Sequence, residues 1–132
     1  MKRVTGIGGV FFKSQDPAKL IEWYQQHLGI ESMPGNMSIF NWRDSDNPNE
    51  EGMTVWCLFK ADSKKFDPST APFMINYRVE DLHGLLAALR EEGVEVDDKV
   101  SEDEFGKFAW VMDPEGNRIE LWEPPKESGK NE

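Results

Sequence analysis

The feature that most constrains the fold of this chain is an order of elements that occurs twice along the sequence. Residues 8–12 have the apolar character of a strand, Asp16 is a favoured helix N-cap, and Gly29 suits the position after a helix. The same order returns with a strand over 73–79 and a Leu-rich helix after Asp81. Because each helix needs a sheet face to cover its apolar stripe, the repeat predicts an α+β fold.

Each predicted helix is followed by further short strands, which are separated by segments rich in Asn, Asp, Pro and Gly. The first unit has strands over 37–43 and 53–60 and a weak strand signal near 30–34. In the second unit the strands cover 94–96, 108–112 and 118–122. Both units are therefore predicted to be βαβββ modules.

The length and composition indicate a single globular domain. The chain has 132 residues, of which 38% are hydrophobic, and it contains eight Phe and five Trp that can fill a packed core. We expect the two modules to cover about 4–60 and 73–123, a linker to cover 61–72, and a flexible tail to cover 124–132.

The chain is strongly acidic, with a formal net charge of −10. This charge argues against nucleic acid and anionic membranes as partners, since both require a basic surface. It favours a cationic ligand through electrostatic attraction, although many proteins carry negative charge for solubility alone. No segment has the apolar core of a signal peptide or the roughly 20 apolar residues that span a bilayer, so a cytoplasmic location is expected.

The cysteine and the two histidines are not predicted to carry chemistry. Cys57 lies in an apolar run, where a free thiol behaves as a small buried side chain. His27 and His83 fall in the two predicted helices, away from the strands. We interpret both histidines as surface or capping residues.

Several segments of the two units resemble motifs of a known superfamily. In the first unit they are GGVFFKSQDP at 8–17, then residues 23–24 and 27–29; in the second they are YRVEDL at 77–82 and DPEGNRIELW at 113–122. Together they resemble the paired units of the vicinal oxygen chelate (VOC) superfamily, which includes glyoxalases, bleomycin resistance proteins and extradiol dioxygenases. The resemblance implies two βαβββ modules in a curved mixed sheet that encloses a cup, with the helices on the outer face, and commonly a homodimer.

In the enzymes of this superfamily, the cup holds a divalent metal on one residue from the first strand and one from the last strand of each unit, most often His and Glu. Transferred to this chain, the four positions are Gly9, Trp56, Met74 and Glu120, where Trp56 follows from setting the turn glycine Gly52 of the first unit on Gly116 of the second. Only the carboxylate of Glu120 suits such a metal, and a catalytic metal normally has about three protein ligands. We therefore expect no metal cofactor, with a divalent metal on an unusual ligand set as the alternative.

The resemblance also implies which side chains line the cup, because alternate residues of a strand share a face. The expected ligand-binding residues are Phe11, Lys13, Trp56, Met74, Asn76, Arg78, Arg118 and Trp122, with Glu120 as the candidate catalytic residue. An apolar surface with few polar groups is typical of a small-molecule pocket. The alternative is a closed core in which Arg78 or Arg118 pairs with Glu120.

Three functions are open for a cup of this composition. The first is a binding protein for a cationic or aromatic small molecule, similar to the bleomycin resistance proteins. The second is an enzyme of the glyoxalase or dioxygenase kind, with Glu120 as a retained metal ligand. The third is a metal-free lyase, isomerase or epimerase in which Glu120 is the general base.

Overall fold

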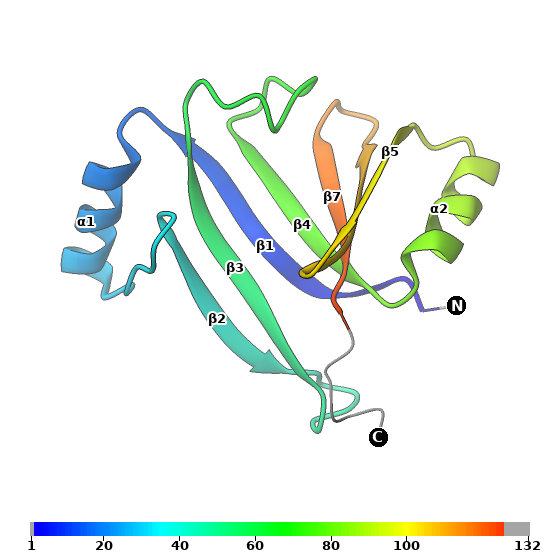
Figure 1. Ribbon diagram of the computed structural model, residues 1–132, viewed down its shortest axis with the longest axis horizontal. Helices are drawn as coiled ribbons and strands as arrows, with labels where there is room; N and C mark the ends of the chain where they lie inside the picture. Colours follow the sequence, from blue (N-terminus) through cyan, green and yellow to red (C-terminus); the bar gives the residue numbers. More distant parts are fainter. Residues whose placement is uncertain (1, 126–132) are drawn as a thin grey trace.

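The computed structural model describes residues 2–125, which form a seven-stranded mixed sheet and two helices (Figure 1). The elements in chain order are β1 (Val4–Ser14), α1 (Pro17–Leu28), β2 (Met37–Arg43), β3 (Glu51–Lys60), β4 (Phe73–Val79), α2 (Leu82–Glu91), β5 (Val96–Asp103), β6 (Gly106–Met112) and β7 (Arg118–Glu123). The predicted α+β fold class is confirmed. Of the tail predicted at 124–132, residues 126–132 lie outside the described residues.

The sheet combines two units that are related by the internal repeat, and its strand order is β2-β3-β1-β4-β7-β6-β5. Within the first unit β1 pairs with β3 in parallel, and within the second β4 pairs with β7 in parallel. The two units meet at the centre of the sheet, where β1 and β4 run antiparallel. This arrangement brings together the first and last strands of both units, which are the strands expected to carry the site.

Two of the predicted strands differ in the structure. Near 30–34, the chain forms only an isolated bridge between Met33 and Met37. The strand predicted at 94–96 is wrong in its bounds, because β5 covers Val96–Asp103. This strand lies at the edge of the sheet and pairs only with β6, so several of its polar residues remain exposed and its sequence lacks the apolar alternation of a half-buried strand.

Both helices begin where the sequence places an aspartate N-cap. The side chain of Asp16 accepts a hydrogen bond from the backbone N–H of Lys19 at 3.2 Å, and that of Asp81 accepts one from Gly84 at 3.1 Å. Gly29 follows α1 in the left-handed conformation, with a φ of 69°. Neither helix within residues 2–125 has the length and apolar character needed to cross a membrane.

The largest buried cluster lies between α2 and the sheet. Leu82, Leu85 and Leu86 of this helix are almost fully buried, and they pack with Ala109 of β6 and Leu121 of β7. The Leu-rich stripe that predicted this helix is therefore the surface that attaches it to the second unit.

Helix α1 packs on an aromatic cluster from the first unit. Tyr24 of this helix contacts Trp56 of β3 and Phe12 of β1, with ring centroids 4.9 and 6.2 Å apart. Because Val10 pairs with Ile75 across β1 and β4, the alternation of side chains puts Phe12 on the same face that α2 covers. Both helices therefore cover one face of the curved sheet, at its two sides (Figure 1), and the opposite face is free of helices.

Candidate functional site

The carboxylate of Glu120 on β7 is held by the two neighbouring strands. Glu120 pairs with Asn76 on β4 and with Trp110 on β6 in the sheet register. The side-chain amide of Asn76 donates to Oε1 of Glu120 at 2.6 Å, and the indole N–H of Trp110 donates to Oε2 at 3.0 Å. Both carboxylate oxygens thus have a donor within the domain, which fixes this side chain on the helix-free face.

Burial raises the pKa of Glu120 above the ordinary value for a glutamate, because removal from water disfavours the charged form. The hydrogen bonds from Asn76 and Trp110 oppose this shift, as do the positive charges of Lys65 and Arg118. The net direction of the pKa shift remains upward. A carboxylate of this kind takes up a proton more readily than an exposed one, which is the property of a general base.

A cavity of about 670 Å³, here called the cup cavity, opens beside Glu120 on the helix-free face. Its volume falls in the range of small-molecule sites. Six strands and the loop 61–72 contribute to its wall. The lining residues are Phe11, Phe59, Ser63, Lys64, Lys65, Met74, Lys99, Trp110, Arg118 and Glu120.

The cup cavity has an aromatic side and a basic side. Phe11 and Phe59 form the aromatic side, with ring centroids 5.5 Å apart. On the basic side, two cations lie over the indole of Trp110: the guanidinium of Arg118 is 5.3 Å and the ammonium of Lys99 is 5.8 Å from the ring centre. The cavity can therefore offer an apolar surface and positive charge to the same ligand.

Arg118 is held in place by Asp97, and it forms no ion pair with Glu120. Its Nη1 lies 3.2 Å from Oδ2 of Asp97, and its side chain is only 12% exposed. The pKa of Asp97 lies below its ordinary value, first because its carboxylate accepts the backbone N–H of Lys99 and then because of Arg118. Arg118 therefore adds positive charge to the cavity without neutralising Glu120 by direct contact.

The sequence from residue 9 to residue 122 matches a family model described as a glyoxalase-like domain. The chain belongs to this glyoxalase-like domain family. The match spans both units of the sheet and includes the strands that carry Glu120, Asn76 and Trp110. No match to a curated protein was found at the sequence level.

Solved structures with the same fold as this glyoxalase-like domain include epimerases. Methylmalonyl-CoA epimerase from Mycobacterium tuberculosis is 23% identical, with a TM-score of 0.59 over 93% of this chain and 90% of that chain. The Streptomyces coelicolor enzyme, in complex with 2-nitronate-propionyl-CoA, is 17% identical, with a TM-score of 0.67 over 93% and 99%. A glyoxalase/bleomycin resistance protein/dioxygenase superfamily member from Vibrio splendidus 12B01 is 12% identical, with a TM-score of 0.58 over 89% and 97%. The predicted membership of the VOC superfamily is confirmed.

Several of the expected site residues come together in this glyoxalase-like domain. Phe11, Met74, Arg118 and Glu120 line the cup cavity. Asn76 is almost fully buried and acts on the cavity through its hydrogen bond to Glu120. The strand parity that placed Met74, Asn76 and Glu120 on one face of the second unit therefore agrees with the structure, and Phe11 of β1 joins them because it pairs with Met74.

The loop 61–72 has a larger part in the site than its linker-like sequence indicated. Its residues 63–65 line the cup cavity, and Phe66 is completely buried beneath them. Phe66 packs on Phe59 with ring centroids 5.2 Å apart, and the ammonium of Lys13 lies 5.3 Å from the centre of its ring. Lys13, which was expected to bind a ligand, thus lies against Phe66, the buried residue that anchors this loop on the sheet.

The structure corrects the expected position of Trp56. Its ring packs on Tyr24 of α1 at 4.9 Å, so it faces the helix side of the sheet. The expectation rested on aligning the turn glycines of the two units, which is one residue out of register, and a shift of one residue moves a side chain to the other face. In the strand register, Cys57 takes the place that Glu120 has in the second unit, and burial raises the pKa of its thiol.

Two further residues that were expected to line the cup contact neighbouring side chains instead and do not line the cup cavity. Trp122 stacks on Phe108 with ring centroids 6.0 Å apart, and its indole N–H donates to the backbone carbonyl of Phe105 at 2.8 Å. The guanidinium of Arg78 lies 5.3 Å from the ring centre of Trp42. Neither Trp122 nor Arg78 contributes to the wall beside Glu120.

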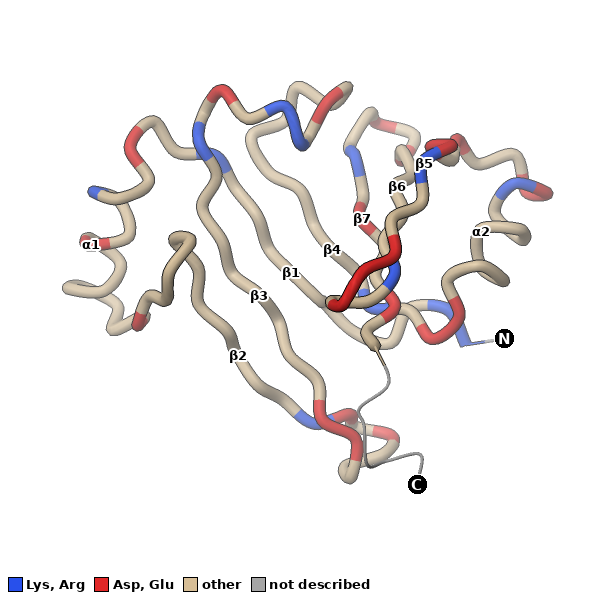
Figure 2. The backbone as a smooth tube through the Cα atoms, in the orientation of Figure 1, with Lys and Arg blue, Asp and Glu red and all other residues tan. Residues whose placement is uncertain are grey.

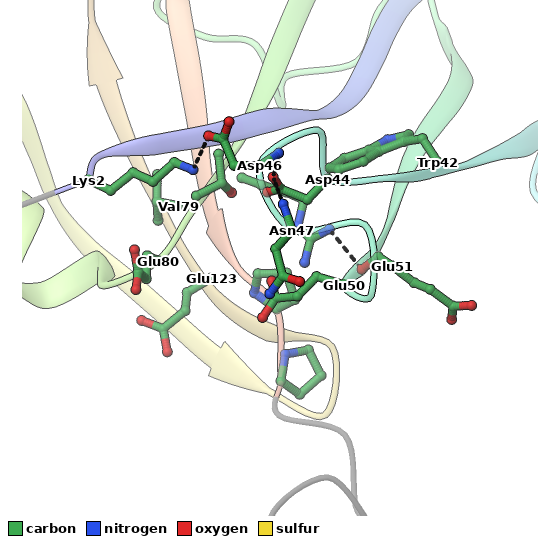
Figure 3. Close-up of a pocket in the computed structure, with 14 residues that line it drawn as sticks. Lys2, Trp42, Asp44, Asp46, Asn47, Glu50, Glu51, Val79, Glu80 and Glu123 are labelled. Carbon is green, nitrogen blue, oxygen red and sulfur yellow. Dashed lines mark hydrogen bonds and ion pairs between the residues drawn. The ribbon is translucent and has the colours of Figure 1, made fainter.

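Arg78 lines a second cavity of about 410 Å³ at the other end of β4. Figure 3 shows this cavity, with the acidic residues Asp44, Asp46 and Glu123 among those labelled around it. Part of the acidic charge there is compensated locally, since Asp46 lies 3.2 Å from Nζ of Lys2 and Asp44 accepts backbone hydrogen bonds within its own turn. Such a surface is typical of a solvated loop, and no feature of it specifies a ligand. Its six carboxylates belong to Asp44, Asp46, Glu50, Glu51, Glu80 and Glu123.

The residues at the metal positions of the superfamily do not fit a divalent metal. A Cβ at Gly9 would lie 2.6 Å from the ring of Phe11, so this ring occupies the space that a ligand side chain would need. Met74 offers only a thioether, Glu120 already accepts two hydrogen bonds, and Cys57, which takes the fourth position in the strand register, adds one thiol to a set that still has fewer than three ligands. In the described part of the chain, residues 2–125, no group of three or more His, Cys, Asp or Glu residues is placed to hold a metal ion.

Proposed function

We propose that the cup of this glyoxalase-like domain binds a small organic molecule without a resident metal, with the part-buried carboxylate of Glu120 as its central polar group. The observation that carries this proposal is the fixed carboxylate of Glu120 in the wall of a cavity of about 670 Å³. Closed protein cores contain few voids larger than a water molecule. A cavity of this size beside a desolvated carboxylate therefore supports a ligand site over a structural core.

Small aromatic molecules are expected to bind in the cup cavity. In NMR titrations with a fragment collection, the largest chemical-shift changes are expected at Phe11, Met74 and Trp110, which line its wall. Replacing Ser63 by tryptophan should fill the cavity and weaken binding by about tenfold or more, as a loss of about 1.4 kcal/mol in contact energy would produce.

Ser45→Trp is the matched control for this test, because Ser45 lies exposed in the acidic turn after β2. It introduces the same side chain far from the cup cavity and is expected to leave fragment affinity unchanged. Chemical-shift changes that avoid the cup, or equal affinities in the Ser63→Trp and Ser45→Trp variants, would contradict the proposed site.

Divalent metals are expected not to stabilise this domain. A specific site would raise the free energy of unfolding by about 2.7 kcal/mol at a metal concentration of 100 times Kd. Thermal unfolding with Zn²⁺, Ni²⁺, Mn²⁺ or Fe²⁺ should show no such increase, and metal analysis should find far less than one ion per chain. A stabilisation that disappears in the Glu120→Gln variant would place a metal on this carboxylate and overturn the metal-free proposal.

A second candidate function is proton transfer in the cup, as in a metal-free isomerase, epimerase or lyase. The upward shift in the pKa of Glu120 favours it, because a general base acts best when its pKa lies near the working pH. The fold is shared with solved epimerases, which supports the comparison at the level of the fold. In such a reaction, Glu120 would take a proton from a carbon next to a carbonyl group and return it. Exchange of that proton with deuterated solvent distinguishes the reaction from binding alone.

A further inference from the structure

We infer that the cup cavity selects a ligand with an oxyanion, a carboxylate or phosphate group, on an aromatic body; this inference rests on the proposed function. The charged part of the lining consists of four cations, Lys64, Lys65, Lys99 and Arg118, and the single carboxylate of Glu120. Because Asp97 pairs with Arg118, the excess of positive charge over Glu120 comes from the three lysines, in a chain whose formal net charge is −10.

The three lysines of the lining are available to a ligand. Within residues 2–125, neither Lys64, Lys65 nor Lys99 forms an ion pair with a carboxylate. All three are exposed, so their ammonium groups are hydrated and can turn toward a bound anion. They come from the loop 61–72 and from β5, which approach one another at the same end of the sheet as the start of β7 (Figure 2).

Arg118 supplies the buried part of the positive charge. Its guanidinium is oriented by Asp97 at 3.2 Å and by the ring of Trp110 at 5.3 Å. Its Nε is buried and donates to no acceptor among the described residues. A guanidinium that lines the cavity wall and is fixed on two sides suits the recognition of an oxyanion through its exposed edge.

The charges that line the cavity outweigh the net charge of the chain for a ligand bound there. Screening limits interactions between exposed charges to about 8 Å at physiological ionic strength. The lysines lie in the cavity wall itself, whereas the acidic cluster around Arg78 lies at the other end of β4. The cationic ligand expected from the sequence rests on the net charge of the chain and on cation–π contact with an aromatic lining, whereas the charges of the cavity wall favour the opposite sign.

Glu120 and the aromatic side of the cavity define how such a ligand would be oriented. The carboxylate of Glu120 repels an anion, so the oxyanion is directed toward the lysines at 64–65 and toward Lys99. The body of the ligand then packs against Phe11 and Phe59. This orientation leaves an uncharged part of the ligand next to Glu120.

Three probes that share one ring and differ in charge test this inference: naphthalene-2-carboxylate, naphthalene-2-carboxamide and 2-naphthylmethylammonium. In NMR titrations of the whole chain, the carboxylate is expected to bind about tenfold or more tightly than the amide, as hydrogen bonds to a charged group would produce. The ammonium should bind most weakly, and the preference for the carboxylate should shrink as salt is added. A titration with 2-naphthyl phosphate compares the two oxyanions.

Lysine variants connect the preference to the cavity. The double variant Lys65→Met with Lys99→Met is expected to remove most of the difference between the carboxylate and the amide. Lys19→Met is the matched control, because Lys19 is an exposed residue of α1 on the other face of the sheet. Its preference for the carboxylate should equal that of the unchanged protein.

Two outcomes would contradict the inference in different ways. Equal affinities for the three probes, with chemical-shift changes still centred on Met74 and Trp110, would overturn the selection of an anion and leave the proposed binding function intact. The absence of changes at the cup cavity with all three probes would overturn both the inference and the proposed function.

Discussion

Replacing Phe66 by alanine is expected to destabilise the domain by about 3–5 kcal/mol, the range typical for removal of a buried aromatic ring. Phe66 is completely buried although it lies in the loop 61–72, and its ring packs 5.2 Å from that of Phe59. Its removal would leave a cavity between this loop and β3. Chemical denaturation, with the m-value checked for each variant, measures the loss in the free energy of unfolding.

Phe105→Ala is the matched control for this prediction, because the side chain of Phe105 is 65% exposed. Its replacement is expected to change the free energy of unfolding by about 0.5 kcal/mol or less. The Phe66→Ala variant should also bind naphthalene-2-carboxylate more weakly, since residues 63–65 lose their anchor. A destabilisation no larger than that of Phe105→Ala would show that Phe66 does not hold the loop against the sheet.

Local signals in the sequence were sufficient for the helices and for most of the strands. Asp16 and Asp81 mark the helix starts because an aspartate side chain satisfies a free backbone N–H there, and the structure contains both of these hydrogen bonds. The edge strand β5 was displaced in the prediction because only one of its sides is paired. An edge strand can keep polar residues throughout, so its sequence carries little of the alternation that identifies buried strands.

Most of the candidate site in the second unit could also be predicted from the sequence. Glu120 lines the cavity as the parity of β7 predicts. Trp110 was not among the expected site residues, although the segment 113–117, which separates the last two predicted strands, has the composition of a tight turn and therefore fixes how these strands pair. A hairpin closed at this turn pairs Met112 with Arg118 and, two residues further, Trp110 with Glu120. The hydrogen bond between the indole and the carboxylate follows from that register.

The sequence alone could not predict on which face of the sheet Trp56 lies, nor that one side of the cup cavity is basic. β1 and β3 are parallel and distant in sequence, so no tight turn fixes their register, and a slip of one residue reverses the face. The basic side depends on where the loop 61–72 folds back over the sheet, which is a long-range property. The net charge of the chain contains no information on this local balance.

On the proton-transfer hypothesis, the largest effect on chemistry is expected for Glu120→Gln. A positioned general base contributes about 10²–10⁴-fold to a rate, and glutamine keeps the shape of the side chain without being able to take up a proton. Phenylpyruvate is a suitable probe, because it combines an aromatic ring, a carboxylate and a C–H group next to a ketone. Deuterium incorporation at this carbon, followed by NMR against the rate without protein, should fall by that factor in the variant.

The pH dependence of this exchange follows from the pKa of Glu120. Only the ionised carboxylate can accept a proton, and burial raises its pKa above the ordinary value. The exchange rate should therefore increase as the pH rises through this raised pKa and level off above it.

The same upward shift in the pKa of Glu120 also predicts how stability depends on pH. The folded state binds the proton more tightly than the unfolded state, so the contribution of Glu120 to stability is lost as the pH rises through the raised pKa. Unfolding curves of Glu120→Gln should lack this part of the pH dependence.

Trp110→Phe separates the role of the carboxylate from that of the surrounding structure. Phenylalanine keeps an aromatic ring in the wall but removes the N–H that donates to Oε2 of Glu120 at 3.0 Å. Because this hydrogen bond favours the charged form, its loss should raise the pKa of Glu120 further and move the midpoint of the exchange profile to higher pH. A purely structural role of Trp110 would lower the rate at every pH without moving the midpoint. An unchanged exchange rate in Glu120→Gln, with phenylpyruvate still bound, would exclude Glu120 as the base and leave the cup as a binding site.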